Sequence, residues 1–194
     1  IIIKHPRQSK NLEETLKHEL NHIYLNNISN SGSFPSWFKE GMAISESAGG
    51  LSLTQIILFS SAKWKNGLYN VNDLDNSFIQ HDHNESQLAY VQSYLMFISL
   101  EDYYGADIYR DIIQKMHQDQ GTQFWSALVE ITQDSKPDIK DKIKQFLDKK
   151  YNWMFLLDRY NLIFIFLPLI LIFGYWHKRY KNRKLLRKWE LEEL

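Results

Sequence analysis

The chain has 194 residues, a formal net charge of zero and no cysteine. This length is enough for one domain with a hydrophobic core and an appended segment. The lack of cysteine excludes disulfides and thiolate metal sites, so any metal must be held by histidine and carboxylate side chains. The first residue is Ile and no basic and apolar leader follows it, so we interpret the chain as the C-terminal part of a longer protein.

The balanced net charge conceals an uneven distribution. Seven of the 23 basic residues lie between positions 178 and 188. Only three acidic residues lie in the rest of this tail, after the basic cluster. Residues 1–160 are therefore mildly acidic. We expect three parts: a domain over residues 1–152, an apolar segment over 153–177 and a basic tail over 178–194.

The beginning of the domain predicts one strand and one long helix. The opening IIIKH is typical of a short strand that Pro6 ends. Asn11 with Glu14 resembles a capping box, which predicts a helix that runs to about Asn27. Five apolar residues of this helix keep helical spacing and are expected to form its core-facing stripe: Leu12, Leu16, Leu20, Ile23 and Tyr24.

The rest of the domain is expected to be helical. Pro35 and Ser36 open a second short helix, and a longer helix with apolar positions from Leu88 to Ile98 should end at Gly105. A polar loop is expected over residues 66–85. Further helices are expected over 54–65, 107–118, 122–132 and 138–150.

The motif HELNH, His18 to His22, lies inside the first predicted helix. Residues four apart on a helix are separated by about 40° of rotation, so His18 and His22 would lie side by side and could bind one metal ion. Glu19 would lie beside the metal without binding it, placed to accept a proton from water. The alternative is two solvated histidines on the surface of an ordinary amphipathic helix.

A catalytic zinc site needs three protein ligands. Glu40, in the segment PSWFKEGMA on the next helix, is the candidate for the third ligand. Gly41 and Ala43 are small enough to let that helix approach the first one closely. The competing interpretation of Glu40 is an ordinary exposed glutamate.

The motif HELNH followed by W-x-x-E-G-x-A resembles the gluzincin metallopeptidases, most closely the peptidase MA-like family of bacterial metallohydrolases. The resemblance covers roughly residues 12–150 and includes a later block, AYVQSYLMFISLEDYYG. It implies that His18, His22 and Glu40 bind Zn²⁺ and that Glu19 is the catalytic base. It also implies a mostly α fold, an α+β zincin-like domain whose N-terminal sheet is largely missing.

The resemblance also implies a donor that stabilises the oxyanion of the transition state. In gluzincins a Tyr or His of a later helix has this role, so Tyr90 and Tyr94 are the candidates, with Tyr90 preferred. Two positions depart from the pattern. Ile44 stands where thermolysin-like enzymes have an Asp, so the partner of a histidine ligand is unassigned, with Thr15 and Asn26 as candidates. The substrate-aligning edge strand is represented at most by Ile1–Ile3.

The uncharged run from Leu162 to Trp176 predicts a single transmembrane helix. The basic cluster after it would be cytoplasmic by the positive-inside bias, which places the catalytic domain on the outer side of a bacterial inner membrane. A buried core helix is the alternative. The position of the basic cluster directly beside the apolar run argues against a nucleic-acid patch.

We therefore expect a membrane-anchored zinc metallopeptidase that acts on peptides or proteins. One alternative is a non-catalytic, zinc-containing, membrane-anchored binding module. Another is a structural membrane protein without metal. The sequence leaves the substrate and the oligomeric state open.

Overall fold

The structure, a computed structural model, describes residues 9–28, 34–71, 73–74, 83–119 and 121–192. This part of the chain is 81% helical and contains no strand. The expected α+β class is therefore wrong for the described residues, which form an all-α structure. The predicted strand IIIKH lies outside them.

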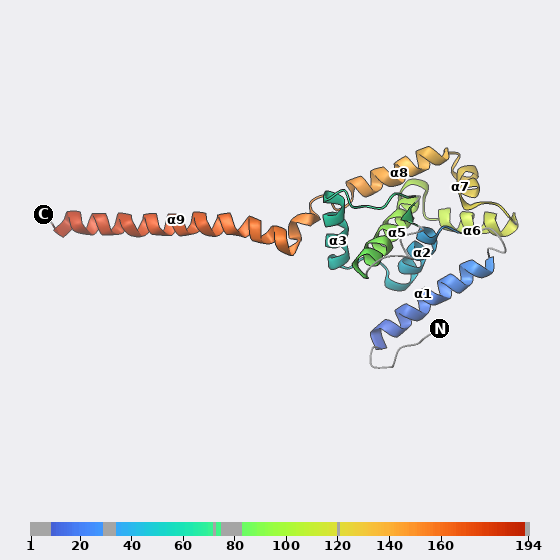
Figure 1. Cartoon of the computed structure of the whole chain (residues 1–194), viewed down its shortest axis with the longest axis horizontal. Coiled ribbons are helices and arrows are strands. Elements are labelled where there is room, and N and C mark those ends of the chain that lie inside the picture. Colours follow the sequence, from blue (N-terminus) through green and yellow to red (C-terminus); the bar gives the residue numbers. More distant parts are fainter. Residues whose placement is uncertain (1–8, 29–33, 72, 75–82, 120, 193–194) are drawn as a thin grey trace.

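The helices follow the predicted order, with bounds that differ by a few residues. They are α1 (Ser9–Ile28), α2 (Ser36–Ala48), α3 (Leu53–Trp64), α5 (His83–Tyr104), α6 (Ile108–Gln118), α7 (Phe124–Thr132), α8 (Lys136–Lys149), the 3₁₀ helix η1 (Met154–Leu157) and α9 (Arg159–Glu192). All but α9 and η1 pack into one helical body, from which α9 projects (Figure 1).

Local signals explain several helix ends. Ser52 and Gln55 form a reciprocal capping box at the start of α3, and the Ser135 hydroxyl caps α8. Gly105 ends α5 with φ +92°, a conformation that favours glycine. The start of α1 differs from the expected one, because the helix begins two residues before Asn11, at Ser9.

The core lies around α5, which packs against α2, α3, α6 and α8. Its apolar side chains Val91, Leu95 and Leu100 are fully buried. Beside them, Trp37 and Phe38 of α2 contact the ring of Phe124 at centroid distances of 5.6 and 5.0 Å. This aromatic packing fixes α2 in the middle of the body.

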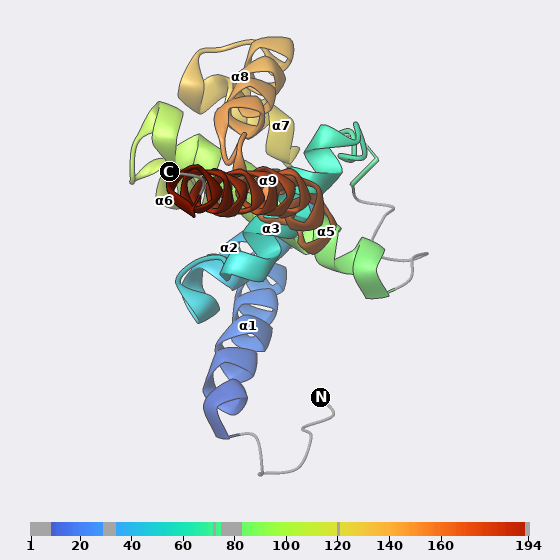
Figure 2. The same cartoon turned by 90° about the vertical axis from the view of Figure 1, so that its left-hand side faces the viewer.

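Helix α1 lies at the edge of the body, against α2 (Figures 1 and 2). Its expected core-facing stripe is wrong: the side chains of Leu12, Leu16, Leu20, Ile23 and Tyr24 are 45–51% exposed. The helical spacing is present, but α2 packs against another face, where Leu25 is fully buried. That second face also carries His18 and His22, so the packing of α1 turns the histidines inward.

Helix α3 holds the junction between α8 and α9. The Lys63 ammonium donates hydrogen bonds to the backbone oxygens of Leu147, Asp148 and Lys150 and to Asn152 Oδ1. Two serines add to this connection, since Ser60 Oγ donates to Tyr151 O at 2.7 Å and Ser61 Oγ to Asp158 Oδ2 at 2.9 Å. The start of α9 is therefore attached to the body through α3.

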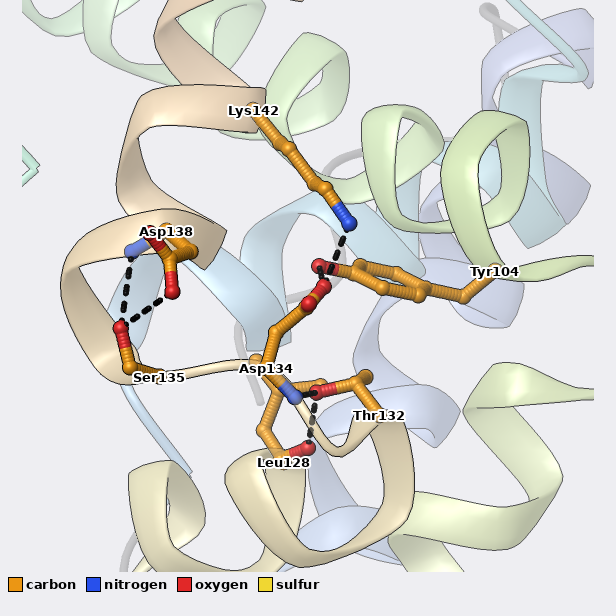
Figure 3. Close-up of polar contacts among 7 residues, drawn as sticks. All are labelled: Tyr104, Leu128, Thr132, Asp134, Ser135, Asp138 and Lys142. Atoms are coloured by element: carbon orange, nitrogen blue, oxygen red, sulfur yellow. Dashed lines mark hydrogen bonds and ion pairs between the residues drawn. The ribbon is translucent and has the colours of Figure 1, made fainter.

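A polar cluster joins the end of α5 to α8 (Figure 3). Asp134 accepts hydrogen bonds from the Tyr104 hydroxyl, at 2.7 Å, and from the Lys142 ammonium. The Thr132 hydroxyl donates to Leu128 O at 2.7 Å, which closes the last turn of α7. These contacts fix the turn between α7 and α8.

Helix α9 corrects the expectation of a transmembrane segment. Among the described residues, no helix is both long and apolar enough to cross a membrane. The apolar run covers only the 15 residues from Leu162 to Trp176, about 23 Å of helix against a bilayer core of about 30 Å. The same helix then continues through the basic segment, so it is not apolar over its length. This finding contradicts the single-pass transmembrane helix expected from the sequence.

Candidate metal centre

The first two helices bring three potential metal ligands together. His18 and His22 lie one turn apart on α1, and Glu40 faces them from the first half of α2. They form the only group of three or more His, Cys, Asp or Glu side chains in the described residues that could hold a metal ion. All three side chains are largely buried, with exposed fractions of 25%, 23% and 18%.

The distances between the ligand atoms fit a zinc ion. The two histidine Nε2 atoms are 3.1 Å apart, and Glu40 Oε2 lies 3.3 Å from His18 Nε2 and 3.6 Å from His22 Nε2. In a tetrahedral zinc site with bonds of about 2.0–2.1 Å, neighbouring ligand atoms lie about 3.3 Å apart. The three atoms therefore occupy three corners of a tetrahedron of the right size.

The chemistry of the ligand set points the same way. Glu40 Oε2 is buried and accepts no hydrogen bond of acceptable geometry in the described residues. A buried carboxylate oxygen without a donor is costly, and a cation would relieve that cost. The donor set of two imidazoles and one carboxylate is one that catalytic zinc sites use. The residues present fit the metal.

The electrostatics of the group keep Glu40 anionic. Burial acts to raise the pKa of Glu40, but the imidazoles of His18 and His22 outweigh it and lower the pKa to about 2. In return, Glu40 raises the pKa of His22 above its ordinary value, against the opposing effect of burial. A negative carboxylate at neutral pH is the form that binds a cation.

Glu19 lies at the rim of this group. Its carboxylate is exposed, and its negative charge helps to raise the pKa values of both His22 and Tyr90. The side chain is therefore within electrostatic reach of the histidines without joining the three ligand atoms. This is the placement that the HELNH spacing predicts.

The two tyrosine candidates differ in their surroundings. Burial, with the charges of Glu40 and Glu19, raises the pKa of Tyr90, so Tyr90 lies near the metal ligands. Burial also raises the pKa of Tyr94, but the charges that add to it come from Tyr151 and Glu101. The Tyr94 hydroxyl lies toward the loop after α2, 3.8 Å from the position that a Cβ of Gly50 would take. Of the two candidates, only Tyr90 has its pKa raised by the charges of Glu40 and Glu19.

Two features of the site were not foreseen in the sequence. Gly41 permits a close approach, as expected, but to α5 rather than to α1: an added Cβ would lie 2.7 Å from Ser93 O and 2.5 Å from Phe97 Cβ. Ser93 is fully buried at this contact. Ser93 lies in the block AYVQSYLMF, but the sequence does not show that Gly41 faces this helix. The roles suggested for Thr15 and Asn26 stay predictions.

A separate hollow of about 520 Å³ lies between the loop after α3, α5 and α8. Its lining includes Lys63, Gln92 and Lys144 but none of the candidate site residues His18, Glu19, His22, Glu40, Tyr90 and Tyr94. The candidate site is thus an open centre between α1 and α2 rather than this hollow.

The comparison with protein families agrees with this geometry. The family model of the Peptidase MA superfamily matches residues 4–131, about two thirds of the chain and all of the elements that carry the candidate ligands. No curated protein and no solved structure matches the chain. On the strength of the family match, the chain belongs to the Peptidase MA superfamily.

Proposed function

We propose that this chain is a zinc-dependent metallopeptidase. The observation that carries the proposal is the convergence of His18 Nε2, His22 Nε2 and the buried Glu40 Oε2 at 3.1–3.6 Å from one another. Membership of the superfamily supports the reaction class.

His18, His22 and Glu40 would hold the metal. A zinc ion bound there supplies a Lewis acid for the substrate carbonyl and lowers the pKa of water to about 7. The two histidines contribute neutral nitrogen lone pairs and Glu40 contributes one negative charge, which leaves the fourth direction open for substrate and water.

Glu19 would act as the general base. Its carboxylate accepts a proton from the attacking water and then passes that proton to the nitrogen of the leaving amine. The exposed position of Glu19 beside the ligands suits a group that must contact both water and substrate. The negative charge that develops on the carbonyl oxygen needs a donor, and the Tyr90 hydroxyl on α5, whose pKa is raised by burial and by the charges of Glu40 and Glu19, is the candidate.

Substitution of Glu19 tests the proposed reaction. Glu19→Gln keeps the size of the side chain but removes the proton acceptor, so we expect hydrolysis of a peptide library to fall by at least about 10²-fold. Zinc content should stay at the wild-type level, because Glu19 is not a ligand. Glu13→Gln, on the exposed side of the same helix, is the matched control and should keep full activity.

The test has clear unfavourable outcomes. Full turnover by Glu19→Gln would refute the role of Glu19. A wild-type chain that binds zinc but cleaves no peptide in the library would favour a zinc-containing binding module. A chain that binds no zinc would contradict both functions.

A further inference from the structure

Two buried side-chain atoms of the described residues have no hydrogen-bond partner: Glu40 Oε2 and Ser93 Oγ. One is a carboxylate acceptor on α2 and the other is a hydroxyl donor on α5. Buried polar groups are normally paired, so each of these atoms needs an explanation. The metal explains the first atom but not the second.

Other hydroxyls in this protein show what Ser93 could have done. Inside a helix, Ser and Thr usually donate to a backbone carbonyl one turn earlier. Thr132 donates to Leu128 O at 2.7 Å, and Ser99, on the same helix as Ser93, donates to Met96 O at 2.6 Å. Ser93 is as fully buried as Ser99 but makes no such bond. Its hydroxyl is therefore available to another group.

The packing of α2 against α5 places Ser93 beside the metal ligand. The carbonyl oxygen of Ser93 lies 2.7 Å from the position of an added Cβ on Gly41, the residue directly after Glu40. The two helices are in backbone contact there, with no side chain of residue 41 between them. This turn of α5 therefore faces the Glu40 segment.

We propose that Ser93 is a positioning residue for Glu40. In this proposal its hydroxyl, which has no other partner among the described residues, donates a hydrogen bond to the Glu40 carboxylate when that group binds the metal. Carboxylates that bind metals are themselves oriented by hydrogen bonds, and loss of such a partner weakens metal binding. This inference rests on the proposed zinc site and adds a residue outside HELNH and Glu40.

The test measures zinc affinity, not activity. In the full chain, Ser93→Ala removes the donor, and we expect zinc affinity in competition with a fluorescent chelator to fall about 10- to 100-fold. Ser93→Thr keeps the hydroxyl and should stay within a few-fold of the wild type. Ser99→Ala, a matched loss of a buried hydroxyl on the same helix, should leave the affinity unchanged. The melting temperature of metal-free Ser93→Ala should not fall, because the lost hydroxyl has no partner there.

Three results would overturn the proposal. The first is an unchanged zinc affinity in Ser93→Ala while the wild type binds one zinc, which leaves the proposed function intact. The second is an equal loss in Ser93→Ala and Ser99→Ala, which indicates general packing damage. The third is a wild-type chain that binds no zinc, which removes the proposed function as well. A loss confined to Ser93→Ala and rescued by Ser93→Thr supports the role of Ser93.

Discussion

At Gly41 the backbones of α2 and α5 are in direct contact, and Glu40, the proposed metal ligand, is the residue next to that contact. A side chain at position 41 would meet the backbone oxygen of Ser93, which cannot move without its helix. The glycine is therefore needed for close packing beside the site. The role of Gly41 is steric, because its φ is not positive and its backbone conformation does not require glycine.

We expect Gly41→Ala to lower the free energy of unfolding by about 1–3 kcal/mol, the usual cost of an overpacked core. Zinc affinity should fall too, because α2 must shift relative to α5. Chemical denaturation and chelator competition measure the two effects. Gly174→Ala is the control, since no atom lies within 4 Å of its added Cβ and alanine favours a helix. An unaffected Gly41→Ala variant would contradict the close contact.

The different surroundings of the two tyrosines lead to a second prediction. Tyr90→Phe removes a donor near the ligands and should lower kcat by about 10²-fold, with little effect on zinc content. Tyr94→Phe should change kcat little, because the Tyr94 hydroxyl lies toward Gly50. Steady-state kinetics on one cleaved peptide compares the two variants. A larger effect for Tyr94→Phe would reverse the assignment.

Residue spacing was informative about this site where the chemistry is local. Four-residue spacing on a helix is sufficient to place His18 beside His22, and the structure agrees. The preference for Tyr90 over Tyr94 needed the structure, because both residues lie on one side of α5. The residues that surround each of them come from distant parts of the sequence. Ser93 was missed for a similar reason: a lone serine in an apolar helix carries no signal until its missing partner is seen.

At the scale of the elements, the polar contacts of Asp134 predict acid sensitivity. Hydrogen bonds from Lys142 and Tyr104 hold the pKa of Asp134 below its ordinary value of 3.8. A carboxyl whose pKa is depressed by folding stabilises the fold above its unfolded pKa, and that stabilisation disappears as the pH falls through the folded pKa. The turn between α7 and α8 should therefore loosen below about pH 4.

We expect Asp134→Asn to lower the melting temperature at pH 7, with a difference from the wild type that shrinks as the pH falls below 4. Thermal melts followed by circular dichroism from pH 7 to pH 2.5 measure this trend. Asp102→Asn, which changes an exposed carboxylate on α5, should follow the wild type. A pH-independent difference for Asp134→Asn would show that the charge of Asp134 is not the cause.

Helix positions were predictable from the sequence because their signals are local. Pro35 and Gly105 act within one or two turns, and the observed start of α2 and end of α5 lie close to the expected ones. The partner of each helix face is not a local property. The stripe from Leu12 to Ile23 has helical spacing, yet it is exposed, because α2 packs on the face that carries Leu25 and the histidines.

At the scale of the whole molecule, the metal would connect the edge of the structure to its centre. Helix α1 lies at the edge and packs mainly on α2, whereas α2 is anchored in the core by Trp37 and Phe38. The C-terminal part was the least predictable: the uncharged run suggested a membrane helix, but the helix that contains it continues through the basic segment. Hydropathy alone does not show where such a helix ends.

The zinc content of the purified full chain tests the central claim most directly. Elemental analysis after dialysis without chelator should give about one zinc per chain for the wild type and for Glu19→Gln. His18→Ala and Glu40→Ala should each lose the bound zinc, because two protein ligands hold zinc poorly. A wild-type chain without zinc, or a His18→Ala variant that retains it at full stoichiometry, would contradict the account.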